Sequence, residues 1–265
     1  MANTDLKHRF GPTALITGAS DGIGRAFAEA LAAWGFDLVL VARRETVLQA
    51  LLRDLVSKHG VKVQVIAADM SDTHATADLM AQTADLPVGL LVVAAGFGSI
   101  GPFLERDIAT EADMVDLNCR SVVELTYAFG QRMALVGGGG IVLFGPLLGF
   151  QGVPGSATYA ATKGFVQGFA EALTVELKPL GISVLSVAPG PVGTGFAARA
   201  GMQMGRVDTP DVVAQAALSA LPNGGTLRPG LMGKLLGWSL APLPRWGRVR
   251  VLGQIMKGMQ GPAKG

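Results

Sequence analysis

A phenol and an ammonium group stand four residues apart in the run Tyr159-Ala160-Ala161-Thr162-Lys163. On a helix this spacing places the first and last side chains on one face, one turn apart. The reference pKa of a phenol, about 10, is too high for easy proton exchange at neutral pH, and a nearby cation is expected to lower it. Tyr159 can then give a proton to a carbonyl oxygen or take one from an alcohol.

A glycine-rich turn follows a short apolar run near the N-terminus. Glycines permit a tight turn and let the backbone approach a pyrophosphate, and the N-terminus of the next helix offers free N–H groups and a positive dipole end. In this sequence the turn is Thr17-Gly18-Ala19-Ser20-Asp21-Gly22-Ile23-Gly24. It predicts a site for a nicotinamide dinucleotide, with contacts at Gly18, Ser20, Asp21, Ile23 and Gly24.

The end of the second apolar run bears on the cofactor's ribose. An acidic residue there would bind the 2′-hydroxyl of NAD, whereas this chain has Ala42-Arg43-Arg44. Two guanidinium groups suit a phosphate ester, so NADP(H) is favoured and NAD(H) stays open as the alternative. Asp21 within the glycine turn argues mildly against this preference, and the arginine pair is also compatible with a solvated start of the next helix.

Short apolar runs alternate with helical patterns along the chain. The predicted strands are Thr13–Ile16, Leu38–Val41, Val61–Ala67, Leu90–Ala94, Ile141–Phe144 and Ile182–Val187. The predicted helices are Arg25–Trp34, Glu45–His59, Thr73–Ala84, Glu111–Val136, Tyr159–Leu180 and one that begins at Thr209-Pro210-Asp211. Continuous apolar strands between helices indicate a parallel sheet covered on both faces. The sequence therefore predicts an α/β fold with a doubly wound, Rossmann-like sheet in a single domain, residues 1–227.

Taken together, these features resemble the short-chain dehydrogenase/reductase family over about residues 11–196. The resemblance rests on Thr17 to Gly24, Asp69-Met70, Ala95-Gly96, Asn118, Tyr159 to Lys163 and Pro189-Gly190-Pro191-Val192. It implies that Asp69 contacts the adenine, and that Asn118 holds a water in a proton relay with Lys163, which also binds the nicotinamide ribose. It also implies cofactor contacts at Met70, Ala95, Gly96, Tyr159, Pro189, Gly190, Val192 and Thr194, a substrate lid at about residues 190–210, and a homodimer or homotetramer.

The chain departs from the family pattern at two places. Val93-Ala94 stands where the family usually has two asparagines, and backbone contacts are expected to replace the lost polar groups. Pro146 stands at the position of the family's catalytic serine and offers neither a hydroxyl nor an N–H. Loss of one such donor typically costs about 10²–10³ in turnover.

Three explanations for Pro146 stay open. Another hydroxyl, from Ser99, Ser156 or Thr158, reaches the site; or the chain is a slow reductase that relies on Tyr159 and Lys163. The third is a cofactor-binding protein with a non-redox, lyase or isomerase, or sensor role, or an impaired variant. The first two make the chain an NADP(H)-dependent oxidoreductase that interconverts a carbonyl compound and its alcohol.

The types of residue near the presumed site also bear on the substrate and on metal binding. Apolar side chains cluster in sequence near the presumed site, and we predict an apolar ketone, aldehyde or secondary alcohol as substrate. They are Phe97, Ile100, Phe103, Leu147, Leu148, Phe150 and Phe196. The three histidines are far apart in the sequence, so no metal site is predicted.

Residues 228–265 mix apolar side chains with cations and contain no acidic residue. This amphipathic extension is expected to be helical and to pack on its own domain or a partner subunit, with peripheral membrane contact as the alternative. No motif for nucleic-acid binding accompanies the charge. The polar stretch 1–11 lacks the apolar core of a signal peptide, and the single cysteine, Cys119, forms no disulfide within the chain, so a cytoplasmic location is expected.

Overall fold

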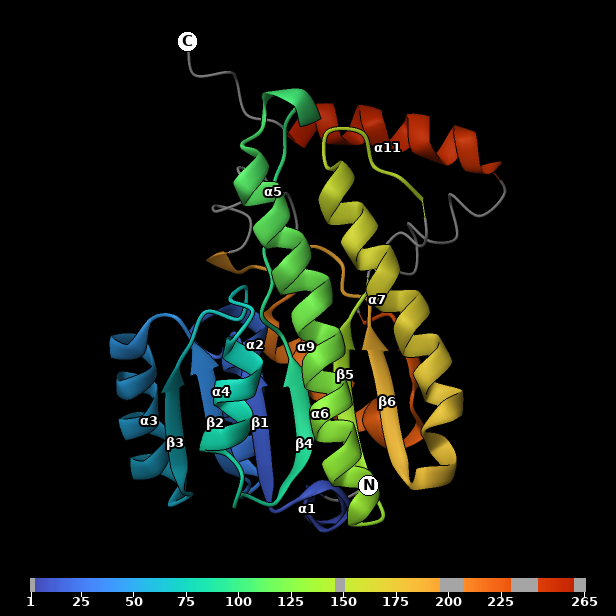
Figure 1. Ribbon diagram of the computed structural model, residues 1–265. Coiled ribbons are helices and arrows are strands. Elements are labelled where there is room, and N and C mark those ends of the chain that lie inside the picture. Colours follow the sequence, from blue (N-terminus) through green and yellow to red (C-terminus); the bar gives the residue numbers. More distant parts are fainter. Residues whose placement is uncertain (1–2, 146–150, 196–206, 230–242, 260–265) are drawn as a thin grey trace.

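The computed structural model of the chain describes residues 3–145, 151–195, 207–229 and 243–259. Within these residues, seven parallel strands form one sheet in the order β3-β2-β1-β4-β5-β6-β7 (Figure 1). The strands are β1 (Thr13–Thr17), β2 (Asp37–Ala42), β3 (Val63–Ala67), β4 (Val88–Val93), β5 (Gly139–Phe144), β6 (Ile182–Val187) and β7 (Gly225–Leu227). The prediction of a single-domain, doubly wound parallel sheet is confirmed.

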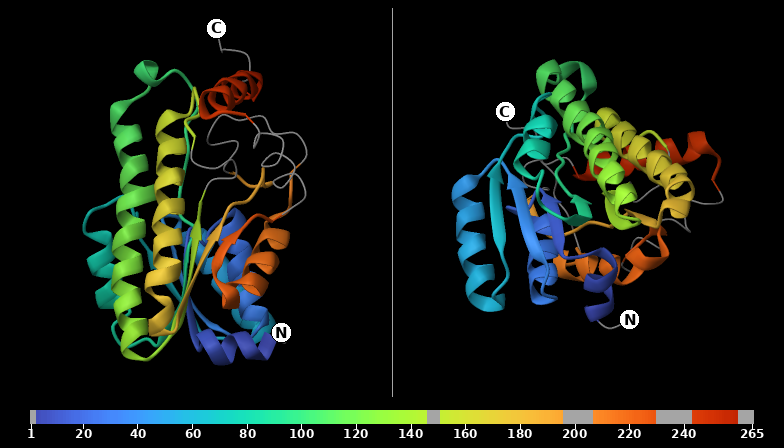
Figure 2. Two further views of the ribbon diagram at one scale, coloured as in Figure 1. Left: turned by 90° about the vertical axis from the view of Figure 1, so that its right-hand side faces the viewer. Right: turned by 60° about the horizontal axis from the view of Figure 1, so that its bottom comes forward.

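Helices cover both faces of the sheet, which explains why the strands are apolar throughout (Figure 2). In β1, Ala14 and Ile16 pack into the core on one face, while Leu15 between them packs into the core on the other. The first face is covered by α2 (Gly22–Ala33), α3 (Glu45–His59) and α9 (Pro210–Ala220). The second face is covered by α4 (Ala75–Gln82), α6 (Ser121–Leu135) and α7 (Ala157–Glu176).

Two features of the structure differ from the predicted pattern of strands and helices. The helix expected over Glu111–Val136 is divided, because a single π-helical turn, η2, separates α5 from α6. β7 pairs with the edge strand β6 and was not predicted, since it has only three residues and no apolar run. The other elements are α1 (Asn3–Phe10), η1 (Phe103–Glu105), α5 (Ile108–Val115), η2 (Asp116–Arg120), η3 (Lys178–Leu180), η4 (Leu221–Asn223) and α11 (Arg245–Met259).

The strand order changes direction between β1 and β4, which are neighbours in the sheet although two strands separate them in sequence. Ligands of open α/β sheets bind outside the carboxyl ends of the strands at such a switch point. Figure 1 shows α11 beyond this same end of the sheet, so the fold places a C-terminal helix over the predicted site. Among the described residues, no helix combines the length and apolar character that crossing a membrane requires.

Candidate active site

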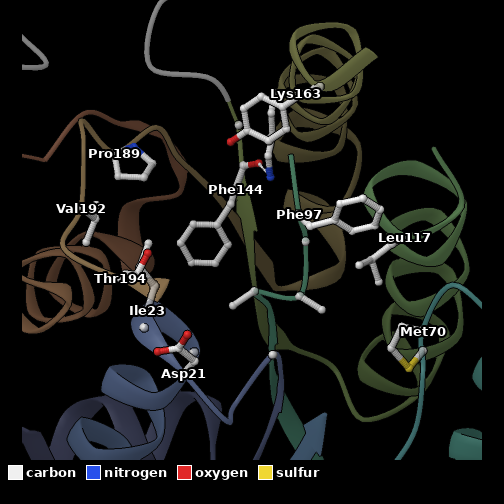
Figure 3. A pocket seen from close by; sticks show the side chains of 18 of the residues that line it. Asp21, Ile23, Met70, Phe97, Leu117, Phe144, Lys163, Pro189, Val192 and Thr194 are labelled. Carbon is white, nitrogen blue, oxygen red and sulfur yellow. Dashed lines mark hydrogen bonds between the residues drawn. The ribbon is translucent and has the colours of Figure 1, made fainter. Parts of the chain in front are cut away.

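A cleft of about 540 Å³ opens at the carboxyl ends of the strands. It brings together all residues predicted to contact the dinucleotide, although they come from segments scattered between the first strand and the loop after the sixth. They are Gly18, Ser20, Asp21, Ile23, Gly24, Arg43, Arg44, Asp69, Met70, Ala95, Gly96, Tyr159, Lys163, Pro189, Gly190, Val192 and Thr194. Figure 3 shows Asp21, Ile23 and Thr194 on one side, with Lys163 beyond Phe144 on the other.

The glycine turn approaches its neighbours too closely for any side chain. Gly18 has a φ of +67°, and a Cβ there would lie 2.8 Å from the backbone N of Ala95. A Cβ on Gly24 would lie 2.4 Å from the carbonyl oxygen of Gly18. The turn leads directly into α2, which begins at Gly22, so the first N–H groups of a helix face the cleft. This arrangement is a backbone cradle suited to an anion.

The arginine pair lies beside this cradle and makes two different contacts. Arg44 Nη2 donates to the Ser20 carbonyl oxygen at 3.2 Å and to Ser20 Oγ at 3.1 Å, and so braces the turn. Arg43 Nη1 lies 3.5 Å from Asp69 Oδ2 in a solvent-exposed ion pair. Burial alone would raise the pKa of the Asp69 carboxyl, but hydrogen bonds from Ser71 and the charge of Arg43 outweigh it and lower that pKa.

Val93 and Ala94 occupy the positions of the family's two asparagines, at the end of β4. The Ala95 N–H donates to Thr17 Oγ1 at 3.1 Å, which ties the ends of β4 and β1 together. Ala94 packs against the core on the α2 face of the sheet. A threonine side chain and the backbone therefore connect these strand ends without the asparagine amides.

Tyr159 and Lys163 share one face of α7 and both line the cleft. Lys163 Nζ lies 5.8 Å from the centroid of the Tyr159 ring and donates to the Phe144 carbonyl oxygen at 3.1 Å. The spacing predicted from sequence thus puts the phenol and the ammonium group side by side, at the end of β5.

Burial sets the proton affinities of this pair. It raises the pKa of the Tyr159 phenol to about 12 and lowers the pKa of the Lys163 ammonium to about 8. The expectation that the pKa of Tyr159 is lowered is therefore wrong in direction, because burial of the phenol raises it. Tyr159 is a protonated donor throughout the neutral range.

Asn118 lies behind the cleft rather than on its wall. It is buried in the π-helical turn η2, where its Nδ2 donates to the Phe97 carbonyl oxygen at 2.9 Å and to Thr162 Oγ1 at 3.1 Å. Its Oδ1 accepts from the Phe97 N–H at 3.3 Å. A Cβ on Gly96 would lie 3.0 Å from this Oδ1 and 3.8 Å from Lys163 Nζ. Asn118 thus joins the segment after β4 to the helix that carries Tyr159 and Lys163.

The hydroxyls considered as replacements for the serine are all engaged. Pro146 itself lies outside the described residues. Ser99 Oγ donates to Glu111 Oε1 at 2.6 Å, and Thr158 hydrogen-bonds the same carboxyl group. Ser156 does line the cleft, but its Oγ donates to the Ser99 carbonyl oxygen at 3.0 Å.

Sequence reasoning missed part of the cleft wall. Gln151 and Val153 line it from the segment before α7, and Leu252 and Ile255 line it from α11. No local pattern connects α11 to the site, since it follows the last strand. Of the apolar residues predicted near the substrate, Phe97 lines the cleft and Ile100 and Phe103 do not, while Leu147, Leu148, Phe150 and Phe196 lie outside the described residues, as does most of the predicted lid.

The fold and the cleft define a dinucleotide-binding α/β protein with a phenol and an ammonium group beside the cofactor site. The sequence profile described as "short chain dehydrogenase" matches residues 12–205. The chain belongs to this family of NAD(P)-dependent dehydrogenases and reductases.

Several known proteins are similar to this chain in sequence or in structure. A very-long-chain 3-oxoacyl-CoA reductase of Meyerozyma guilliermondii is 37% identical over 185 residues, which are 66% of this chain and 54% of the reductase. A short-chain dehydrogenase of Sphingobium yanoikuyae, solved in complex with NADPH, is 32% identical with a TM-score of 0.79, over 96% of this chain and 98% of the other. A bulky-bulky ketone specific alcohol dehydrogenase of Comamonas testosteroni is 31% identical with a TM-score of 0.75, over 97% of each chain.

The match to the curated reductases covers only part of their length. The chain spans about half of the length of the Meyerozyma guilliermondii enzyme and a similar share of other fungal reductases of the same name. The Sphingobium yanoikuyae and Comamonas testosteroni structures, by contrast, match this chain almost from end to end.

Proposed function

We propose that this chain is an NADP(H)-dependent oxidoreductase that interconverts an apolar carbonyl compound and its alcohol through Tyr159 and Lys163. The observation that carries the proposal is that one cleft brings together the glycine cradle, the arginine pair and the Tyr159–Lys163 pair. The NADPH complex of the Sphingobium yanoikuyae relative supports the same cofactor.

The described residues fit a dinucleotide. A pyrophosphate would be held by the backbone cradle at Gly18 and Gly24, where a Cβ would collide with backbone atoms. Arg43 and Arg44 would face a 2′-phosphate, and Asp69 with Met70 would face the adenine side. When bound, the nicotinamide ring supplies the hydride that reduces the carbonyl carbon.

Tyr159 supplies the proton. With a pKa raised to about 12, the phenol is protonated at neutral pH and gives its proton to the carbonyl oxygen. The charge left on the phenolate is stabilised by the Lys163 ammonium group next to the ring. Asn118 fixes the Phe97 segment against Thr162 and so helps to position α7, and a water held there would return a proton through Lys163.

The cleft residues that are not assigned to the dinucleotide support an apolar substrate. Phe97, Leu252 and Ile255 line this part together with Val153. The names of the relatives agree with this chemistry, since a very-long-chain 3-oxoacyl-CoA and a bulky-bulky ketone both present a carbonyl group in an apolar frame.

Two measurements test the proposal. The first is NADPH consumption across a panel of ketones that runs from small to bulky apolar compounds and includes a long-chain 3-oxoacyl thioester. We expect turnover that increases with apolar bulk; cofactor binding without consumption of any panel member would favour the non-redox or sensor role instead. The second is the ratio of the dissociation constants for NADPH and NADH, and tighter NADH binding would contradict the NADP(H) preference.

Other sequence-based predictions stay predictions. They are the homodimer or homotetramer, the cytoplasmic location, and the packing or membrane contact of residues 228–265. The structure adds one observation on the last point: Leu252 of α11 is buried against the chain's own fold.

A further inference from the structure

Tyr159 lies in the first turn of α7, which begins at Ala157. The first N–H groups of a helix have no partners within it, and helix ends fray, so a reacting group placed there needs support from outside the helix. The hydroxyl of Ser156, the residue before the helix, donates to the Ser99 carbonyl oxygen at 3.0 Å rather than capping these N–H groups. The position of the phenol therefore depends on what else holds this turn.

A buried carboxylate from a neighbouring helix holds it. Glu111, in the first turn of α5, has 5% of its surface exposed and lies behind the cleft wall rather than on it. Its carboxyl group accepts hydrogen bonds from Thr158, the neighbour of Tyr159, and from Ser99 Oγ at 2.6 Å. Arg106 Nε lies 3.5 Å from Glu111 Oε1. One carboxylate thus joins α5, the connection between β4 and α5, and the first turn of α7.

The carboxylate keeps its charge although it is buried. A buried charge is costly unless it is paired and hydrogen-bonded. Burial alone would raise the pKa of this carboxyl, but hydrogen bonds from Ser99 and Thr158 and the charge of Arg106 outweigh it and lower that pKa. The positive dipole end of α7 also favours a negative charge beside its first turn. Thr158 is therefore held by an ionised acceptor throughout the neutral range.

The two segments that meet at this carboxylate are also tied to each other. The Gly101 N–H donates to the Gly155 carbonyl oxygen at 2.9 Å, which joins the β4–α5 connection to the segment before α7. Arg106 Nη1 donates to the Ile100 carbonyl oxygen at 2.8 Å, within the same connection. These bonds fix where the Glu111 carboxylate can hold α7.

Asn118 offers a comparison, because it holds the next turn of α7. Its Nδ2 donates to Thr162 Oγ1 at 3.1 Å, and Thr162 follows Thr158 by four residues, on the same face of the helix. Two threonines one turn apart are thus each held by a buried polar side chain, one from α5 and the other from η2. Tyr159 lies between them in sequence and faces the cleft.

We propose that Glu111 is a positioning residue of the reductase: its carboxylate holds Thr158, and with it the first turn of α7, so that the Tyr159 phenol meets the substrate carbonyl oxygen in the geometry for proton transfer. This role rests on the proposed function. Misplacement of a reacting group by about 1 Å can cost about 10² in rate, so a residue behind the cleft can control turnover without contacting substrate or cofactor.

The test compares kcat, KM and the NADPH dissociation constant of two Glu111 variants with those of the wild type. Leucine keeps a similar volume but removes every acceptor, so Glu111→Leu should lower kcat about 10-fold to 10²-fold, with KM and NADPH affinity within a factor of about two. Glutamine keeps a carbonyl oxygen that can accept, so Glu111→Gln should recover most of the lost kcat. Thr158→Val removes the same contact from its other end and should lower kcat as Glu111→Leu does.

Two further readouts separate positioning from a general loss of stability. Because Glu111 acts through the phenol, adding Glu111→Leu to a Tyr159→Phe variant should change the residual turnover by less than a factor of about two. The solvent deuterium isotope effect on kcat should rise in Glu111→Leu, since proton transfer from a misplaced phenol becomes slower.

The matched control is Arg132→Met, which removes a polar anchor of α6 away from the cleft. Arg132 Nη2 donates to the carbonyl oxygens of Thr83 and Leu86 at 2.6 Å each, near the amino end of β4. This variant should lower the free energy of unfolding and leave both kcat and the isotope effect unchanged.

Three outcomes are decisive. A Thr158→Val variant that keeps the wild-type kcat overturns the inference, whatever Glu111→Leu does, and leaves the proposed function intact. Equal losses from Glu111→Leu with and without the Tyr159 hydroxyl also overturn it, because Glu111 would then not act through the phenol. A wild-type chain that binds NADPH but reduces no carbonyl compound overturns the proposed function, and the inference with it.

Discussion

The two sides of the cleft are built in different ways. On the cofactor side, the critical contacts are between backbone atoms: Gly18 and Gly24 lie where a Cβ would collide with the backbone around it. On the substrate side, the groups that line the cleft are side chains from distant segments, namely Phe97, Tyr159 and Leu252. The first side depends on the absence of side chains and the second on their identity.

This difference determines how each side tolerates change. A backbone cradle that binds phosphates through helix N–H groups allows few substitutions and keeps a recognisable local pattern. A wall of side chains can exchange one donor for another, or one apolar residue for another, while the fold is unaffected. The departure at Pro146 falls on the second side. We therefore expect variants on the substrate side to change turnover and variants on the cofactor side to change binding and stability.

The largest effect is expected for Tyr159→Phe, which removes the proton donor and little else. Turnover in carbonyl reduction should fall by about 10²–10⁴, while the NADPH dissociation constant stays within a factor of about two. The matched control is Tyr127→Phe, since Tyr127 is the other tyrosine of the chain and is exposed on α6. Equal losses in both variants, or weakened NADPH binding by Tyr159→Phe, would contradict the assignment of the two sides.

Gly18→Ala should have the next largest effect, on binding rather than on chemistry. The new Cβ would meet the Ala95 backbone and the residue would keep a φ of +67°, so NADPH should bind about 30-fold more weakly, equal to about 2 kcal/mol, with a similar loss of stability. Gly60→Ala is the control, because Gly60 has a φ of +66° but nothing within 4 Å of its Cβ position. It should lose some stability and no NADPH affinity; equal affinity losses would show that the close approach is irrelevant.

The same difference explains what could be predicted from the sequence. The strands, the glycine turn and the pairing of Tyr159 with Lys163 follow from periodicities and spacings within a few residues. The π-helical turn at Asn118 could not be predicted, because it depends on hydrogen bonds to Phe97 and Thr162. The same holds for Leu252, whose place on the cleft wall is set by how α11 packs across the finished domain.

The sequence also misled in one respect, the pKa of Tyr159. A helical spacing shows that a cation is near, but it does not show how deeply the phenol is buried. In the folded chain, burial raises the pKa of the Tyr159 phenol to about 12. For the mechanism, this means that the neutral phenol is stable at neutral pH and that the phenolate formed after proton transfer is the species that requires stabilisation.

The pH dependence should therefore reflect Lys163. Its pKa is lowered to about 8, so the cation that stabilises the Tyr159 phenolate is lost as the pH rises through that value. Reductive turnover should fall about tenfold per pH unit above about pH 8. Loss of folding at Lys163 cannot cause this fall in turnover. Between about pH 8 and 10.5 the unfolded chain binds more protons at Lys163 than the folded chain does, so the contribution of this residue to the free energy of unfolding rises with pH. Arginine at this position, in Lys163→Arg, should abolish the fall, and a fall that persists would exclude Lys163 as its source.

The smallest effects are expected for the arginine pair, where the two residues should differ. Arg43 is held only by an exposed ion pair with Asp69 in the described structure, so its guanidinium can turn to a 2′-phosphate. Arg43→Ala should weaken NADPH binding about fivefold, equal to about 1 kcal/mol, and leave NADH binding unchanged.

Arg44→Ala should weaken the binding of both cofactors, because Arg44 braces Ser20 in the turn that would bind the pyrophosphate of either one. Arg53→Ala, on the exposed side of α3, is the control and should change neither constant. If Arg44→Ala affected NADPH alone, Arg44 would belong with the side chains that select the cofactor and not with the cradle that binds it.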